Sequence, residues 1–111
     1  MEERRQTERV KVALDAHWEG VLVHCSGTVV DLSVTGCFIL TPDQVQPQEL
    51  IRMEIEKPTG GCIYLWGEVV YQVSEMGFAL RFTGATDREE QMLQLLIDYV
   101  REAESELQAC A

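Results

Sequence analysis

The sequence predicts a mainly β fold: a six-stranded antiparallel β-barrel followed by a C-terminal α-helix. Its 111 residues are close to the commonest size of one independently folding domain. Six short segments alternate between apolar and polar residues, as half-buried strands do, and the end of the chain changes to the three-to-four-residue spacing of an amphipathic helix. Six short strands joined by short turns close most readily into a barrel.

The expected strands follow one another with short turns between them. They comprise residues 10–19, 28–32, 37–41, 51–56, 63–73 and 78–82. The turn-forming stretch 33–36 makes the second and third strands a hairpin, and two prolines within 42–48 indicate a loop. Gly67 lies near the middle of the fifth strand, where a glycine indicates a bulge or a bend.

The final segment is expected to be a helix from about residue 87, with Thr86 and Glu89 spaced as a capping box at its start. Its apolar residues recur every three or four positions: Met92, Leu96, Tyr99, Val100, Ala103 and Leu107. We expect this stripe to pack on the barrel, and the excess helix length leaves both a monomer and a homodimer open. Residues 10–111 then form one domain, preceded by a flexible, arginine-containing segment at residues 1–9.

The composition is that of an ordinary globular protein, with 46% hydrophobic and 25% charged residues. No apolar run is long enough for a membrane span, and the first eleven residues are too charged for a signal peptide. We therefore expect a cytoplasmic protein without membrane insertion. The four cysteines form no Cys-x-x-Cys pair and neither histidine completes a ligand cluster, so we expect no metal and no cofactor.

Charge is distributed unevenly along the chain. The net charge is −10, which disfavours broad electrostatic binding to DNA or RNA. Four of the nine basic residues nevertheless lie within the first eleven: Arg4, Arg5, Arg9 and Lys11. A small, compact anion fits this distribution better than a long polyanion.

The first candidate motif is the segment Arg4-Arg5-Gln6-Thr7-Glu8-Arg9, just before the first strand. If it reaches over the barrel, its guanidinium groups offer planar forks suited to phosphate oxygens and to the O6/N7 edge of guanine. The alternative is a solvated, charged terminus, and the motif alone does not decide between the two.

The second candidate motif is Asp31-Leu32-Ser33-Val34-Thr35-Gly36. Strand alternation would place Asp31 and Ser33 side by side on one face. A carboxylate can accept hydrogen bonds from the paired donors of guanine, and Gly36 would allow close backbone approach or a positive φ. The alternative is a hairpin in which Asp31 and Ser33 only satisfy turn amides.

Together these motifs resemble the PilZ domain family of cyclic di-GMP receptors, which is marked by Arg-x-x-x-Arg and by Asp/Asn-x-Ser-x-x-Gly. Arg5 and Arg9, preceded by Arg4, match the first motif, and residues 31–36 match the second. The segments 67–70 and 77–82 are similar to the family's Gly-x-Val strand and its Gly-x-x-x-Arg-Phe segment. Thr35 departs from many relatives, which puts ligand affinity rather than fold in doubt.

The resemblance implies a c-di-GMP-binding receptor or adaptor, not an enzyme. The ligand-binding residues that it implies are Arg4, Arg5, Arg9, Asp31, Ser33 and Gly36. Binding would draw residues 1–9 onto the barrel and signal to an unidentified downstream protein controlling motility, adhesion or exopolysaccharide. The alternative is a PilZ-like interaction module that does not bind nucleotide. An oligonucleotide-binding barrel fits poorly, because aromatic residues are only 7% of the chain and the net charge is negative.

Overall fold

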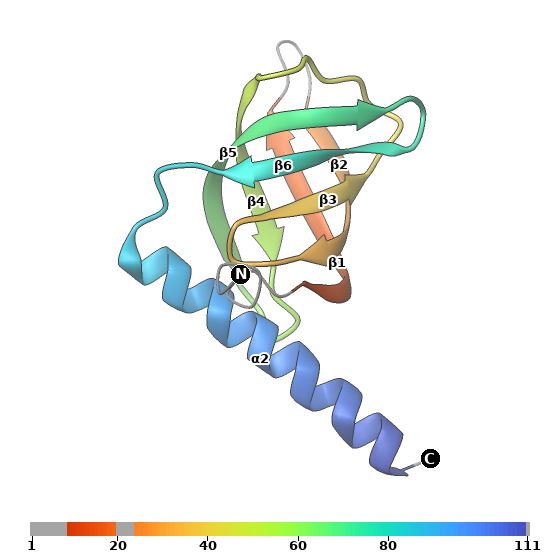
Figure 1. Ribbon diagram of the computed structural model, residues 1–111, viewed down its shortest axis with the longest axis vertical. Helices are drawn as coiled ribbons and strands as arrows, with labels where there is room; N and C mark the ends of the chain where they lie inside the picture. Colours follow the sequence, from red (N-terminus) through yellow and green to blue (C-terminus); the bar gives the residue numbers. More distant parts are fainter. Residues whose placement is uncertain (1–8, 20–23, 111) are drawn as a thin grey trace, which may run out of the picture.

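The computed structural model describes residues 9–19 and 24–110, with side chains described up to residue 103. The described part contains the predicted barrel and helix (Figure 1). The elements are β1 (Val10–Glu19), β2 (His24–Leu32), β3 (Gly36–Leu40), β4 (Leu50–Glu56), β5 (Cys62–Val73), β6 (Gly77–Phe82) and α2 (Asp87–Cys110). The prediction of a six-stranded antiparallel barrel with a C-terminal helix is confirmed.

The sheet closes on itself in the order β1-β2-β3-β6-β5-β4, and all neighbouring strands are antiparallel. Four of the neighbouring pairs are hairpins of consecutive strands, whereas β3 and β6 are adjacent in the barrel but not consecutive in the chain. The short pairing of Ala16 with Ile55 and of His17 with Glu54 joins β1 to β4 and completes the barrel. Figure 1 shows β3 and β6 side by side on the face turned to the viewer.

The core fills the inside of the barrel with the apolar residues of the alternating pattern. Its largest fully buried side chains include Phe78, Leu32, Ile39, Met53, Ile55, Ile63 and Leu65. Trp18 meets Phe78 edge to face, with ring centroids 5.4 Å apart. These aromatic rings contribute contact area and a favourable ring geometry at the centre of the domain.

Bulges in β2 and β5, the strands on either side of the β3–β6 pair, change which of their residues face outward. In β2 the register shifts between Val29 and Asp31, and in β5 it shifts between Val69 and Tyr71. Of the bulge or bend expected at Gly67, the bulge is not found there: Gly67 has regular partners on both neighbouring strands, and the register of β5 shifts two residues later. A glycine is needed there because a Cβ atom would collide with the side chain of Leu80.

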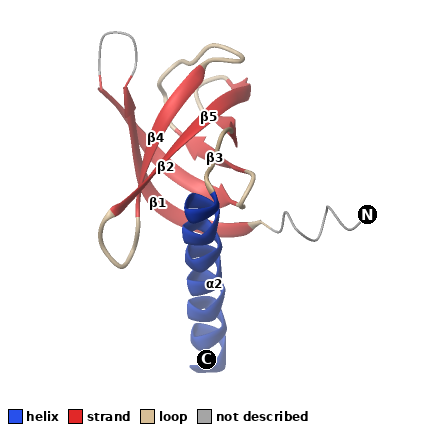
Figure 2. Ribbon diagram, turned by 90° about the vertical axis from the view of Figure 1, so that its left-hand side faces the viewer, coloured by secondary structure: helices blue, strands red, loops and turns tan. Residues whose placement is uncertain are grey.

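The capping box at the start of α2 is present in both directions. The Thr86 N–H donates to Glu89 Oε1 at 2.9 Å, and the Glu89 N–H donates to Thr86 Oγ1 at 3.2 Å. Leu93, Leu96 and Ile97 are the residues that the helix buries against the barrel. Met92 and Val100 pack partly buried beside them, and the end of the helix extends away from the barrel (Figure 2). Among the described residues, no helix is long and apolar enough to cross a membrane.

We expect Phe78→Ala to lower the free energy of unfolding by about 3–5 kcal/mol, because it leaves a cavity at the centre of the barrel and removes the contact with Trp18. Urea denaturation followed by tryptophan fluorescence measures this. Val70→Ala is the control, since Val70 is 54% exposed and surface substitutions usually change stability by less than about 0.5 kcal/mol. Equal effects of the two substitutions would contradict the described core.

Candidate ligand-binding site

The structure brings one residue of each sequence motif together on the outer surface of the barrel. Arg9 Nη1 lies 3.0 Å from Asp31 Oδ1, across a sequence separation of 22 residues. The pairing of β1 with β2 produces this contact, because Val10 lies opposite Leu32 and Lys11 lies opposite Asp31. The start of the first strand is thus held beside the end of the second.

Both partners of this ion pair remain accessible. The Arg9 side chain is 51% exposed and that of Asp31 is 26% exposed. Lys11, opposite Asp31 in the register, is also exposed and adds a second positive charge at the same end of β1. Arg4 and Arg5, the other predicted arginines, lie outside the described residues.

Ser33 is fully buried, so the expectation that it projects beside Asp31 is wrong. The reason is that β2 ends at Leu32, and the chain turns before strand alternation reaches Ser33. Its Oγ accepts hydrogen bonds from the backbone N–H groups of Thr35 and Gly36, each at 3.2 Å, and lies 3.0 Å from Thr35 Oγ1. Ser33 therefore fixes the shape of the turn that follows Asp31.

Gly36 is required by the neighbouring strand. A Cβ atom at this position would collide with the carbonyl oxygen of Leu80 on β6. The φ angle of Gly36 is not among the positive values of the described residues, so close approach is the reason for this glycine, not a left-handed backbone. Its predicted contact with a ligand stays a prediction.

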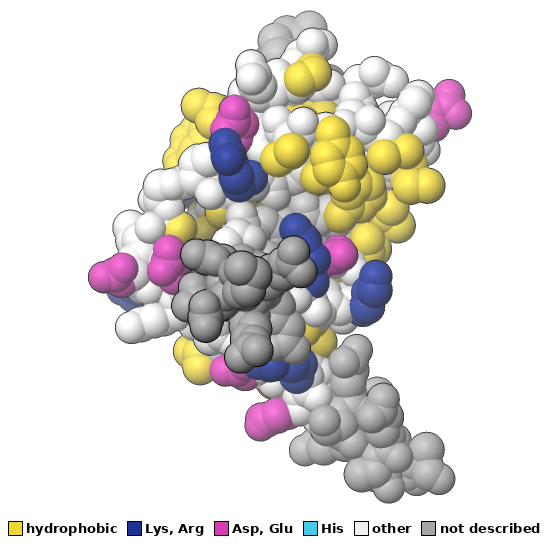
Figure 3. All heavy atoms as spheres, viewed as in Figure 1, with side chains coloured by type: hydrophobic (Ala, Val, Ile, Leu, Met, Phe, Trp, Pro, Cys, Tyr) yellow, Lys and Arg dark blue, Asp and Glu magenta, His cyan; other side chains and the backbone are white. Residues whose placement is uncertain are grey.

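A row of outward-facing residues begins at Asp31 and contains one residue from each of four adjacent strands. Asp31 on β2 pairs with Phe38 on β3, Phe38 with Ala79 on β6, and Ala79 with Tyr71 on β5. The small side chain of Ala79 lets the two rings meet, with centroids 6.3 Å apart and planes tilted by 39°. Figure 3 shows a hydrophobic patch on this face of the molecule, with basic side chains beside it.

A second ion pair lies in the neighbouring row. Arg81 on β6 pairs with Gly36 on one side and with Glu68 on the other. Its Nη2 lies 2.7 Å from Glu68 Oε1, and the Arg81 side chain is 64% exposed. Sequence reasoning did not include Arg81, Phe38 or Tyr71 among the site residues. The bulge in β5 puts Tyr71 out of phase with simple alternation, so no periodic signal marked it.

Cys37 lies directly beneath this surface and is not a reactive group there. Burial raises the pKa of its thiol to about 12, while the nearby charge of Arg9 lowers it and that of Asp31 raises it. The cysteine therefore stays a neutral thiol and packs as a small hydrophobic residue. In the described part of the chain, no group of three histidine, cysteine or acidic side chains could hold a metal ion.

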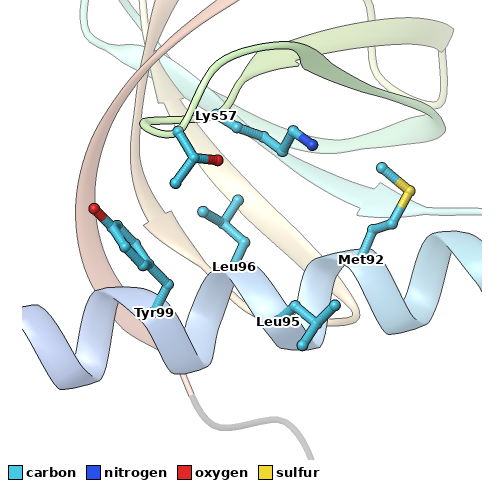
Figure 4. A pocket seen from close by; sticks show the side chains of 6 residues that line it. Lys57, Met92, Leu95, Leu96 and Tyr99 are labelled. Atoms are coloured by element: carbon cyan, nitrogen blue, oxygen red, sulfur yellow. The ribbon is translucent and has the colours of Figure 1, made fainter.

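The hollow shown in Figure 4 lies elsewhere, between α2 and the turn that joins β4 to β5. It has a volume of about 270 Å³ and is lined by Lys57, Thr59, Met92, Leu95, Leu96 and Tyr99. None of the motif residues lines it. The Arg9–Asp31 pair lies on the barrel wall, apart from this hollow, and both of its side chains are partly exposed.

Comparison with known proteins identifies this architecture. The family model of the PilZ domain matches residues 3–99. Among solved structures, YcgR from Escherichia coli in complex with c-di-GMP has a TM-score of 0.82 at 17% identity; the match covers 97% of this chain and 51% of YcgR. The isolated PilZ domain of YcgR with c-di-GMP gives 0.79 at 16% identity and covers 95% of this chain and 98% of that domain. MrkH from K. pneumonia, also as a c-di-GMP complex, gives 0.76 at 16% identity and covers 93% and 55%.

The protein is a small closed barrel with a C-terminal helix, and its fold is similar to those of these three structures. The chain belongs to the PilZ domain family. It spans about half the length of the full YcgR chain, so the activities of that larger protein do not transfer with the fold. No match is found among curated proteins.

We expect Ser33→Ala to lower the free energy of unfolding by about 1–3 kcal/mol, because the buried N–H of Gly36 and the partly buried N–H of Thr35 lose their acceptor. Urea denaturation measures the change. Ser26→Ala is the matched control, since Ser26 is exposed on the same strand pair and should change stability by less than about 0.5 kcal/mol. Unchanged stability of Ser33→Ala would show that the turn does not depend on this hydroxyl.

Proposed function

We propose that this protein is a receptor for cyclic di-GMP. The observation that carries the proposal is the ion pair of Arg9 with Asp31, which joins one residue of each motif at one place on the barrel. YcgR and MrkH, whose folds resemble this one, are described as c-di-GMP complexes. At their low sequence identity the shared fold does not by itself identify a ligand of this chain; the chemistry of the motif residues supports cyclic di-GMP.

The two side chains suit the two parts of such a ligand. A carboxylate accepts hydrogen bonds from two donors, which matches the N1–H and N2–H₂ groups of guanine. A guanidinium donates through a planar fork, which fits phosphate oxygens and the O6/N7 edge of guanine. In this proposal Asp31 reads guanine, Arg5 and Arg9 bind phosphates and guanine edges, and Arg4 stacks on a base. Ser33 and Gly36 hold the turn that positions Asp31.

The Arg9–Asp31 pair must open for both groups to contact the ligand. Exposed ion pairs of this kind contribute at most about 1 kcal/mol, and both side chains are partly in contact with water. Hydrogen bonds to charged groups contribute about 1.5–3 kcal/mol each. Exchanging one internal pair for several bonds to a dinucleotide is therefore favourable.

We infer that the response is conformational and not catalytic. Among the described residues around Asp31, no histidine or second carboxylate is bonded to a hydroxyl or thiol nucleophile. Ligand binding would draw residues 1–9 onto the barrel and change the surface presented to a downstream protein. Control of motility, adhesion or exopolysaccharide is the output that we propose, from the family resemblance.

We expect calorimetric titration to show that the wild-type protein binds cyclic di-GMP. Arg9→Ala should weaken binding at least about tenfold, because it removes a charge-assisted donor, and Asp31→Ala should do the same by removing the guanine acceptor. Arg88→Ala is the control: Arg88 is exposed on α2, at the start of the helix, and its loss should leave the affinity unchanged. No binding by the wild type would overturn the proposed function and favour an interaction module.

Hydrogen exchange tests the conformational part of the proposal. We expect amide exchange in residues 1–9 to slow when cyclic di-GMP is added, because their backbone would become ordered against the barrel. Exchange in α2 serves as the internal reference. Tight binding with equal exchange in residues 1–9 with and without ligand would contradict the switch but not the receptor.

A further inference from the structure

The aromatic pair on the barrel wall is the feature that the sequence motifs leave unexplained. Phe38 is the register partner of Asp31, and Tyr71 lies two strands further along the same row. Adjacent strands are about 4.8 Å apart, so the Phe38 ring stands within one strand spacing of the Asp31 carboxylate. The outer surface thus carries a line of side chains in the order Asp31, Phe38, Ala79 and Tyr71.

Tyr71 is more exposed than sheet packing requires, and Phe38 beside it is partly exposed. Cross-strand aromatic pairs stabilise a sheet by removing ring surface from water, yet Tyr71 keeps 54% of its surface exposed and so does its bulged neighbour Val70. The β5 bulge is what turns both residues outward in succession. An accessible aromatic face next to guanidinium groups is the kind of surface on which nucleobases stack.

The charges around the rings complete the chemistry of a nucleotide site. Arg9 and Asp31 lie at the β2 end of the row, and Arg81 lies in the next row, held by Glu68. A purine that lies on the rings can direct its edge toward Asp31 and leave its phosphate near the arginines. The stacking surface accepts any base, because every base has a π face, whereas the carboxylate selects guanine by its donors.

We propose that Phe38 and Tyr71 form the stacking platform for a guanine base of the ligand, whose edge is read by Asp31. This inference rests on the proposed function and adds to it two binding residues that the sequence motifs do not contain. It assigns the wall of β3, β6 and β5, and not only the ends of β1 and β2, to the ligand-binding surface.

Calorimetric titration of cyclic di-GMP into Tyr71→Ala tests the platform. We expect about a tenfold loss of affinity, since stacking of one base contributes about 1–3 kcal/mol by alanine substitution. Tyr71→Trp should bind within about threefold of the wild type, because it restores an aromatic face. Guanine H8 in the wild-type complex should show an upfield ring-current shift in proton NMR, and Tyr71→Ala should reduce it.

Tyr64→Ala is the matched control. Tyr64 is a 43%-exposed tyrosine on the same strand, about 23 Å from Tyr71 at about 3.3 Å per residue, and it stacks on Arg52 instead. Its loss should not change the affinity. Wild-type affinity and an intact H8 shift in Tyr71→Ala would overturn the platform, while Arg9→Ala and Asp31→Ala would still report on the receptor function. A wild-type protein that does not bind would overturn the receptor function itself.

Discussion

The close pairing of β3 with β6 is the constraint on which both the barrel and the proposed binding surface depend. Two glycines permit it: a Cβ at Gly36 would collide with the Leu80 carbonyl oxygen, and one at Gly77 with that of Ile39. Through this pairing the hairpin that carries Asp31 is joined to the hairpin that carries Tyr71 and Arg81. Gly36 of the 31–36 motif and Gly77 of the 77–82 segment are therefore explained by backbone contact within the barrel, before any ligand is considered.

The bulges convert this closed sheet into a surface with a distinct chemistry. A regular strand would turn alternate residues inward, so Asp31 or Tyr71 would be lost from the outer row unless one residue were added. The extra residue falls on β2 and on β5, the two strands that flank β3 and β6. Each bulge interrupts the regular strand pairing at one position. It turns an apolar residue and a residue of the proposed site outward in succession.

Most of the fold could be predicted from the sequence because burial dictates it. The alternation in β1 and β4, the capping box at Thr86 and the antiparallel hairpins each leave a local signal. Site geometry does not, because it depends on register between distant strands. Ser33 was misplaced since the turn interrupts alternation, and Tyr71 was missed since a bulge shifts its phase. The contact of Arg9 with Asp31 depends on the register of the β1–β2 hairpin, which shifts between Lys11 and Leu14 and is not set by the alternating pattern.

The acidity of the chain constrains how the proposed site would bind an anion. With a net charge of −10, the protein as a whole repels a dinucleotide at long range, but charges beyond about 8 Å are largely screened at physiological salt. Binding energy must then come from short contacts: guanidinium to phosphate, carboxylate to guanine and ring to base. Because Arg9 and Asp31 neutralise each other before the ligand arrives, neither is presented as an isolated charge to unrelated ions. A ligand has to satisfy both groups at once to separate them, and that requirement favours a molecule carrying a phosphate and a donor-bearing base over a simple anion.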